Sequence, residues 1–155
     1  MSDESPNPLS LLTRFAADGG SADEILICTF NQNLPFFERH VLPACRATGA
    51  RVTVLGDIGM AEHDLVATSR ANRRYYAGNV SAARSFHPKL IVIASPSQAT
   101  VAVGSGNMTV AGWLGNDELW TIHRGDAVAA SPVIAAVRDW CSRLPTATRM
   151  SEVAS

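Results

Sequence analysis

The sequence predicts an α/β fold in which a mixed, largely parallel β-sheet is flanked by helices on both faces. Short apolar segments that suit buried strands alternate along the chain with segments of helical periodicity. The first 60 residues contain a strand, a helix and a second strand, a β-α-β unit that should be parallel and right-handed. Farther along, residues 86–94 and 100–103 are apolar segments joined by a short turn, which predicts a hairpin.

The elements of the first half follow from capping residues and apolar spacing. Residues 11–17 predict a short helix with Ser10 as its N-cap. Residues 24–30, rich in Ile and Leu, predict a buried strand. A helix over 35–48 follows, because a proline opens it and apolar residues recur at helical spacing. Pro43 inside this segment indicates a kink or break.

The remaining elements are less regular in sequence. Residues 51–56 predict the second strand of the β-α-β unit, and residues 61–71 predict a helix. The segment between that helix and the hairpin is assigned no element. One or two helical turns over 108–114, a strand over 118–124 and a helix over 127–143 complete the expected order.

Length and composition indicate one globular domain. The chain has 155 residues, of which 46% are hydrophobic and 17% are charged, so it is large enough to bury a sizeable core. We expect a leader with a short helix over 1–20, one domain over 21–145 and a flexible tail over 146–155.

The formal net charge of −1 excludes a global basic field of the kind that dominates non-specific binding to nucleic acid. A local basic patch around a substrate groove remains open, as does the alternative that the same side chains form a solvated surface. The arginines concerned are Arg51, Arg70, Arg73, Arg74 and Arg84.

Cysteine usage and hydropathy give no sign of a metal site or a membrane segment. Cys28, Cys45 and Cys141 are widely spaced and lack the paired spacing of a zinc site, so we interpret them as small buried hydrophobic residues. No segment approaches the roughly 18 consecutive apolar residues that a transmembrane helix needs. We therefore expect a cytoplasmic protein without a bound metal ion and without a membrane partner.

Two short motifs indicate a site that handles phosphate. His87 and Lys89 are two residues apart on a predicted strand, so their side chains share one face and place a nucleophile or base beside a cation. The segment 104–107, Gly-Ser-Gly-Asn, follows one hairpin later. Its glycines permit close backbone approach to an anion, and Ser105 and Asn107 supply hydrogen-bonding groups.

His-x-Lys followed by Gly-Ser-x-Asn resembles the phospholipase D superfamily, whose members include lipases, nucleases and tyrosyl-DNA phosphodiesterases. The longer segment 104–120 is similar to the nuclease-like bacterial branch and to the tyrosyl-DNA phosphodiesterases, and segment 29–38 resembles the opening of those bacterial members. The resemblance extends roughly over residues 25–140. It implies the fold of one phospholipase D-like half.

One position departs from the superfamily pattern. The lipase branch has an aspartate five residues after the motif lysine, where this chain has Ala94. Tyrosyl-DNA phosphodiesterases and several nuclease-like members instead carry an acid or amide downstream of the motif asparagine, and Glu118 is the candidate here. The departure counts against a lipase more than against a nuclease, and it leaves an inactive relative open.

The resemblance implies two-step covalent catalysis without a metal or another cofactor. His87 would attack phosphorus, a second histidine would protonate the leaving oxygen, and water would hydrolyse the phosphohistidine. Lys89, Ser105 and Asn107 would hold the non-bridging oxygens, and Glu118 would orient the histidine or a neighbouring ligand. Candidates for lining the pocket are Asn31, Asn33, Glu38, Gly104 and Gly106.

Each of these residues also has a purely structural interpretation. His87 can be an ordinary histidine at the end of a strand, and segment 104–107 can be a tight turn and nothing more. Glu118 can face solvent, and Asn33 can cap a helix. The order of the motifs along the chain favours the functional interpretation.

A chain of this length carries one motif, whereas superfamily enzymes place two motifs across a pseudo-twofold axis. We therefore expect a symmetric homodimer in which His87 of the two subunits meets across the interface. The alternative is a piece, or a short relative, of a longer protein with two motifs.

The predicted function is that of a metal-independent phosphodiesterase acting on nucleic acid, DNA rather than RNA, as a nuclease or end-processing enzyme. The alternative is a catalytically weak or inactive module that binds phosphate or nucleic acid within a larger or oligomeric defence or repair protein. A lipase is the third and least favoured class.

Overall fold

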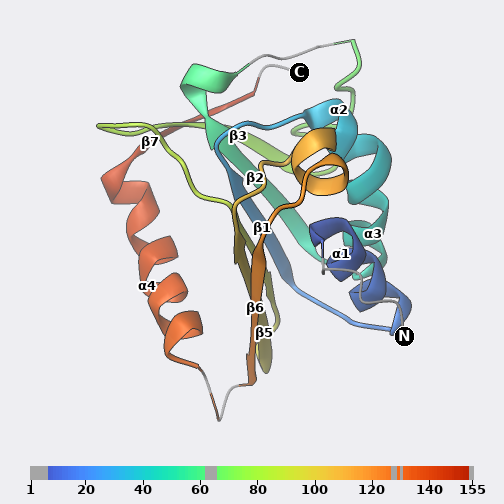
Figure 1. The fold of residues 1–155 in the computed structure, drawn as a ribbon. Coiled ribbons are helices and arrows are strands. Elements are labelled where there is room, and N and C mark those ends of the chain that lie inside the picture. The colour runs from blue at the N-terminus through green and yellow to red at the C-terminus, as the bar shows by residue number, and fades with distance from the viewer. Residues whose placement is uncertain (1–6, 62–65, 127–128, 130, 154–155) are drawn as a thin grey trace.

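The computed structural model describes residues 7–61, 66–126, 129 and 131–153, and its sheet confirms the predicted α/β class. In this part of the chain seven strands form one mixed sheet in the order β6-β5-β4-β1-β2-β3-β7 (Figure 1). The strands are β1 (Glu24–Thr29), β2 (Arg51–Asp57), β3 (Tyr76–Ser81), β4 (Leu90–Ala94), β5 (Gln98–Gly104), β6 (Trp120–Asp126) and β7 (Arg149–Glu152).

Parallel pairing is confined to the middle of the described sheet. β1 pairs with β2 and β2 with β3 in parallel, as the β-α-β pattern predicts. The pairings of β1 with β4, β4 with β5, β5 with β6 and β3 with β7 are antiparallel. The sheet is therefore mixed, with a parallel centre and antiparallel flanks.

Helices cover both faces of the sheet, again as expected (Figure 1). α1 (Pro8–Ala17), α2 (Leu34–Phe36) and α3 (Leu42–Ala47) lie on one face, and α4 (Pro132–Ala147) lies on the other. Apolar side chains on the α1 face, including Leu12, Ile27 and Phe37, form the larger buried cluster. Cys28, Val80 and Leu144 belong to a smaller cluster under α4. No helix in the described segments is long and apolar enough to cross a bilayer.

Prolines explain the form of two elements. The helix predicted over 35–48 has the break that Pro43 indicates, because a π-helical turn, Phe37–Val41, lies between α2 and α3. This wider turn ends two residues before Pro43, whose ring would clash with a carbonyl four residues earlier in a regular α-helix. β4 begins at Leu90 and not at residue 86, since Pro88 has no N–H to give to a strand pairing. His87 and Lys89 thus lie in the segment that enters the strand.

Two segments differ more strongly from prediction. Ser10 does not cap α1; its backbone N–H donates to the side chain of Asn7, which is the N-cap. The helix expected over 61–71 is not formed by its described part, residues 66–71, where turns occur, and residues 62–65 lie outside the described residues.

The end of the chain is more ordered in secondary structure than the expected tail over 146–155. α4 continues to Ala147, and β7 pairs with β3 and so satisfies the backbone groups on one side of β3. Val153 is buried, and its N–H donates to Ala77 O at 2.9 Å. The four residues of β7 are all exposed, which explains why hydropathy does not reveal the strand.

Candidate active site

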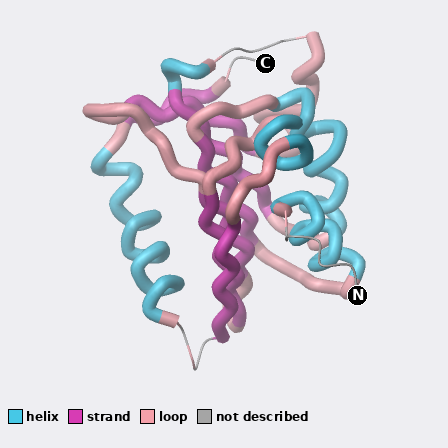
Figure 2. The backbone as a smooth tube through the Cα atoms, in the orientation of Figure 1, coloured by secondary structure: helices cyan, strands magenta, loops and turns pink. Residues whose placement is uncertain are grey.

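The residues expected to be catalytic lie at one edge of the sheet, where β1 ends. Because β4 is antiparallel to β1, and β5 to β4, the start of β4 and the end of β5 reach that same edge. The start of β6 joins them, since Gly104 pairs with Trp120. Figure 2 shows the loops that gather beyond these strand ends. His87 and Lys89 precede β4, segment 104–107 leaves β5, and Glu118 precedes β6.

His87 and Lys89 are in direct contact. Lys89 Nζ lies 2.8 Å from His87 Nδ1 and 3.2 Å from Nε2. An ammonium carries only donors, so the acceptor is whichever of the two ring nitrogens lacks a proton in the tautomer present. The two groups are therefore side by side as predicted, although they are not part of the strand. A lone pair bonded to an ammonium cannot attack phosphorus, so attack through that nitrogen requires Lys89 to turn toward another acceptor.

Phe30 is a member of the site that the sequence interpretation missed. Its ring centroid lies 4.3 Å from that of His87, and Lys89 Nζ lies 5.7 Å from the Phe30 ring centroid. The ring thus supports the imidazole on one side and offers a weak cation–π contact to the ammonium. The sequence prediction included Phe30 in the strand over 24–30, whereas β1 ends at Thr29 and Phe30 is the first residue after it.

The environment of Lys89 lowers the pKa of its ammonium below the ordinary value of 10.5. Partial burial is the larger cause, because it penalises the charged form. The nearby carboxylate of Glu118 acts in the opposite direction and favours the charge. Glu118 therefore belongs to the electrostatic surroundings of the His87–Lys89 pair.

Ser105 and Glu118 are joined by a hydrogen bond. Ser105 Oγ donates to Glu118 Oε2 at 2.5 Å and accepts from the N–H of Leu119 at 3.1 Å. Asn116 Nδ2 donates to the second carboxylate oxygen of Glu118 at 3.3 Å. The Ser105 hydroxyl uses its one proton in the hydrogen bond to Glu118. In this arrangement it can orient the carboxylate, but it has no proton left to donate to a phosphate.

Asn107 is fixed by the end of β1. Its Oδ1 accepts from the Asn31 N–H at 3.1 Å and lies 3.4 Å from Thr29 Oγ1. Thr29 is buried and also accepts from the N–H of Met108 at 3.0 Å. The amide oxygen is thus used for structure, whereas the Nδ2 group makes no hydrogen bond within the described part of the chain and can donate to an anion. Thr29 was not predicted, since a threonine at the end of a strand carries no distinctive signal.

The glycines of segment 104–107 are required by chain packing. A Cβ on Gly104 would lie 2.4 Å from Trp120 Cδ2, and one on Gly106 would lie 2.3 Å from the carbonyl oxygen of Gly112. A Cβ on Gly112 would in turn lie 2.3 Å from Asn107 O. These contacts explain the glycines by the packing of neighbouring chain segments, whereas the sequence analysis expected them to allow close approach of an anion.

Three further residues were expected to line the pocket, and the structure uses them differently. Asn31 is at the site, where its backbone fixes Asn107. Asn33 caps α2, since its Oδ1 accepts from the Phe36 N–H at 2.9 Å. Glu38 is not an exposed ligand. It is 5% exposed, and its carboxylate accepts hydrogen bonds from elsewhere in the fold. The donors are Ser69 N, Arg70 N, Ala71 N and Tyr75 Oη.

The arginines considered for a basic patch do not surround this site as one group. Arg51 begins β2, at the opposite edge of the sheet, and pairs with Glu24. Arg70 donates to the Glu38 carbonyl at 3.3 Å and lines a separate hollow with Arg46 and Arg74. The prediction of one basic patch formed by all five arginines around this site is therefore wrong.

The comparisons with known proteins show the fold. No protein-family model and no curated protein sequence matches the chain. Among solved structures, the chain is similar to polyphosphate kinase from Porphyromonas gingivalis, with a TM-score of 0.59 and 11% sequence identity. The match covers 95% of this chain and 22% of the kinase chain. The architecture of this chain is thus similar to that of a segment that makes up about a fifth of the kinase chain.

Proposed function

We propose that the chain is one half of a metal-independent phosphodiesterase that acts on nucleic acid through a covalent phosphohistidine. One observation carries the proposal: the segment with His87 and Lys89 lies at the same sheet edge as Asn107 and Glu118 from two other segments, with Lys89 Nζ 2.8 Å from His87 Nδ1. The architecture shared with a polyphosphate kinase and the resemblance to the phospholipase D superfamily both support phosphoryl-transfer chemistry at this edge.

The chemistry proceeds in two displacements. A phosphate oxygen draws Lys89 away from His87, and the freed imidazole nitrogen forms a bond to phosphorus while the bond to the leaving oxygen breaks. A second histidine supplies the proton to that oxygen; it then accepts a proton from a water molecule that attacks phosphorus as the phosphorus–nitrogen bond breaks. Lys89 and Asn107 Nδ2 offset the charge on the non-bridging oxygens.

The proposed source of the second histidine is another copy of the motif. In the described residues the His87 ring contacts Phe30 and Lys89, while His40 packs on Phe36 and His123 lies within β6. His87 is exposed at an open edge, so a facing subunit has access to it. We propose that a second identical chain supplies the partner histidine in a symmetric dimer, with a further part of a longer protein as the alternative source.

The test is cleavage of a labelled DNA oligonucleotide in excess chelator. We expect activity in the unmodified chain, its loss in His87→Ala, and its retention in His40→Ala, whose side chain is exposed on a helix. Acid-labile phosphorylation of His87 in quenched reactions would identify the intermediate. A protein that remains monomeric by light scattering and cleaves nothing contradicts the enzyme.

The second candidate function is a binding module without catalysis. The lone pair of His87 is engaged by Lys89, and the aspartate of the lipase branch is absent at Ala94. DNA binding that is retained in His87→Ala, without cleavage by either protein, supports the module over the enzyme.

A further inference from the structure

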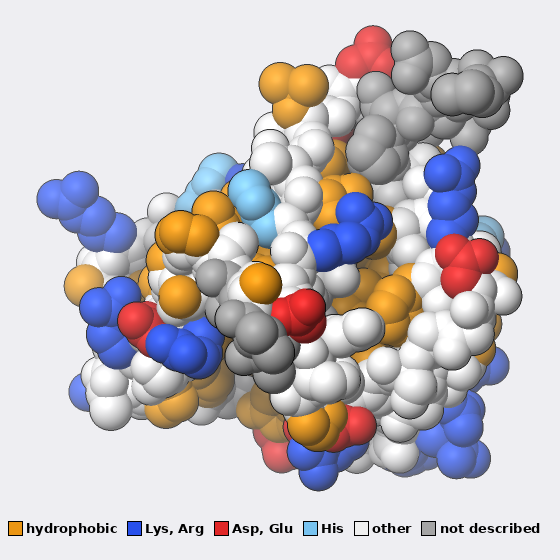
Figure 3. Space-filling model, turned by 90° about the horizontal axis from the view of Figure 1, so that it is seen from below, with side chains coloured by type: hydrophobic (Ala, Val, Ile, Leu, Met, Phe, Trp, Pro, Cys, Tyr) orange, Lys and Arg blue, Asp and Glu red, His pale blue; other side chains and the backbone are white. Residues whose placement is uncertain are grey.

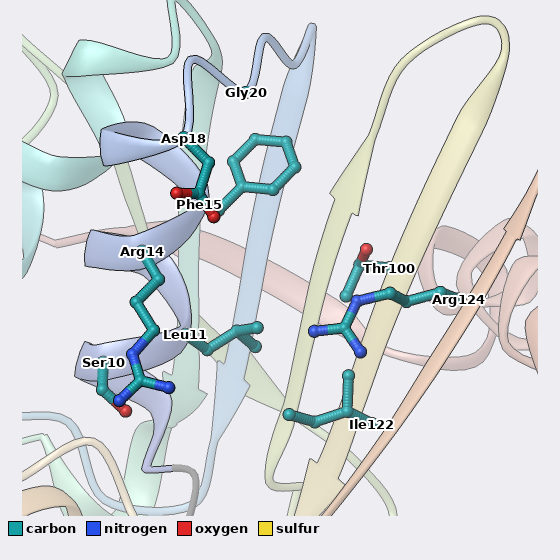
Figure 4. Close-up of a pocket in the computed structure, with 9 residues that line it drawn as sticks. All are labelled: Ser10, Leu11, Arg14, Phe15, Asp18, Gly20, Thr100, Ile122 and Arg124. Carbon is teal, nitrogen blue, oxygen red and sulfur yellow. The ribbon is translucent and has the colours of Figure 1, made fainter. Parts of the chain in front are cut away.

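A cavity of about 330 Å³ lies between α1 and the β5–β6 pair, away from the candidate active site (Figure 4). Thr100 and Arg124, which line it, are directly opposite each other on β5 and β6. Thr100 precedes Gly104 by four residues, which corresponds to about 13 Å along a strand. The cavity is thus a separate feature of the α1 face, and its volume is in the range of pockets that hold small molecules.

Two arginines line this cavity from different elements. Arg14 comes from α1 and Arg124 from β6, on opposite walls; Figure 4 shows the Arg124 guanidinium directed across the space toward α1 and the Arg14 side chain extended along α1 beside Ser10. Both residues are exposed, and neither side chain forms an ion pair or hydrogen bond within the described part of the chain. Asp18 is the single acidic residue of the lining. The lining therefore has an excess of positive charge that an anion would neutralise.

The rest of the cavity offers an apolar wall. Leu11, Phe15 and Ile122 line it, and Leu11 and Ile122 belong to the larger hydrophobic cluster or pack against it. Phe15 lies close against Gly20, where an added Cβ would lie 2.5 Å from Phe15 O and 2.7 Å from the ring carbon Cε1. Figure 3 shows hydrophobic side chains in the middle of the lower face with Lys and Arg side chains beside them.

We propose that this cavity binds a phosphate monoester that carries a flat apolar group, as a nucleoside monophosphate does. Two guanidinium forks on opposite sides match an anion with three terminal oxygens better than a planar carboxylate. Thr100 supplies a further hydroxyl beside Arg124. The flat group lies against Phe15 and Ile122, where its burial excludes water from the charged contacts.

This site goes beyond the proposed function and does not depend on it. None of the residues that line the cavity belongs to the candidate active site. Binding here is expected to persist in His87→Ala, and failure of either proposal leaves the other intact.

The experiment is calorimetric titration of the whole chain with adenosine monophosphate, ribose 5-phosphate and inorganic phosphate. We expect adenosine monophosphate to bind most tightly, and Arg14→Gln and Arg124→Gln each to weaken it by at least about tenfold, as loss of a charge-assisted hydrogen bond predicts. Arg143→Gln removes an exposed arginine of α4 that is not in the lining, and is expected to change nothing. Equal binding of all three ligands, or unchanged affinity in both variants, overturns the proposal.

Amide chemical shifts locate the ligand without any substitution. Adenosine monophosphate should perturb residues 10–18, Thr100 and residues 122–124 in the unmodified chain and in His87→Ala. Shifts confined to residues 86–90 and 104–107 place the ligand at the candidate active site and overturn the proposal. Absence of any shift at millimolar ligand also overturns it.

Discussion

Glu118 accepts a hydrogen bond from Ser105 Oγ at 2.5 Å, and its charge partly opposes the lowering of the Lys89 pKa by burial. One carboxylate therefore links the Gly-Ser-Gly-Asn segment to the His-x-Lys segment. In the superfamily pattern that the sequence resembles, the lipase branch has an acid at the position of Ala94. Here the candidate acid, Glu118, comes from a different segment.

Glu118→Gln is expected to lower the pKa of Lys89 further. Burial already moves this pKa below 10.5, and the Glu118 carboxylate opposes the shift, so its neutralisation removes the opposing effect. The proposed phosphate contact of Lys89 requires its charge, which Lys89 carries at pH values below its pKa, so the alkaline limb of the proposed activity should move to lower pH. NMR titration of the Lys89 side chain measures the pKa directly. Asp117→Asn, the exposed neighbour, is the control; an unchanged or raised Lys89 pKa in Glu118→Gln contradicts the role.

Two substitutions of Asn107 are expected to distinguish its role in stability from its proposed role in phosphate binding. Asn107→Ala removes the acceptor of the Asn31 N–H and should lower the free energy of unfolding by about 1–3 kcal/mol. Asn107→Asp keeps acceptor oxygens at that place but replaces the Nδ2 donor by a negative charge, so it should fold well and bind phosphate poorly. Urea unfolding and phosphate titration of both variants provide the measurements. Equal phosphate binding in Asn107→Asp and the unmodified chain rules out Asn107 as a phosphate donor.

The sequence predicts the elements that depend on local apolar patterns and on the order of motifs. It predicts fewer of the features that depend on contacts between residues far apart in the chain. The β-α-β unit and the hairpin are found because buried strands and their turns are local. β7 is not, since its residues are exposed and it exists through pairing with β3. The missed Phe30 and the misassigned Glu38 have the same cause: their partners, His87 and residues 69–75, are more than 30 residues away in sequence.

Gly106→Ala is expected to destabilise the fold through a backbone clash. The added methyl would lie 2.3 Å from Gly112 O and 3.0 Å from Glu118 Cγ, and overpacking of this kind costs about 1–3 kcal/mol. Gly115→Ala is the matched control, because its nearest neighbour is Val110 O at 3.8 Å, an ordinary contact. Urea unfolding of both variants checks the difference. Similar stability in the two variants would show that segment 104–107 does not need close contact with the turn at Gly112.

Glu38→Gln is expected to lower stability without altering the His87–Lys89 contact. The two carboxylate oxygens of Glu38 accept from three backbone N–H groups and from Tyr75 Oη. An amide places N–H donors where one oxygen stood, so at least one backbone or hydroxyl donor then faces another donor, at a cost of about 1–3 kcal/mol.

The control for this prediction is Glu24→Gln, which breaks the exposed pair with Arg51 and should change stability little because water screens that pair. Denaturant unfolding measures both variants, and the His87 ring signals report on the site. Burial and the Glu38 charge also raise the pKa of Tyr75, so Glu38→Gln should bring the Tyr75 titration to lower pH. Reduced phosphate binding in a Glu38→Gln variant of unchanged stability would contradict this prediction and support the sequence prediction that Glu38 lines the pocket.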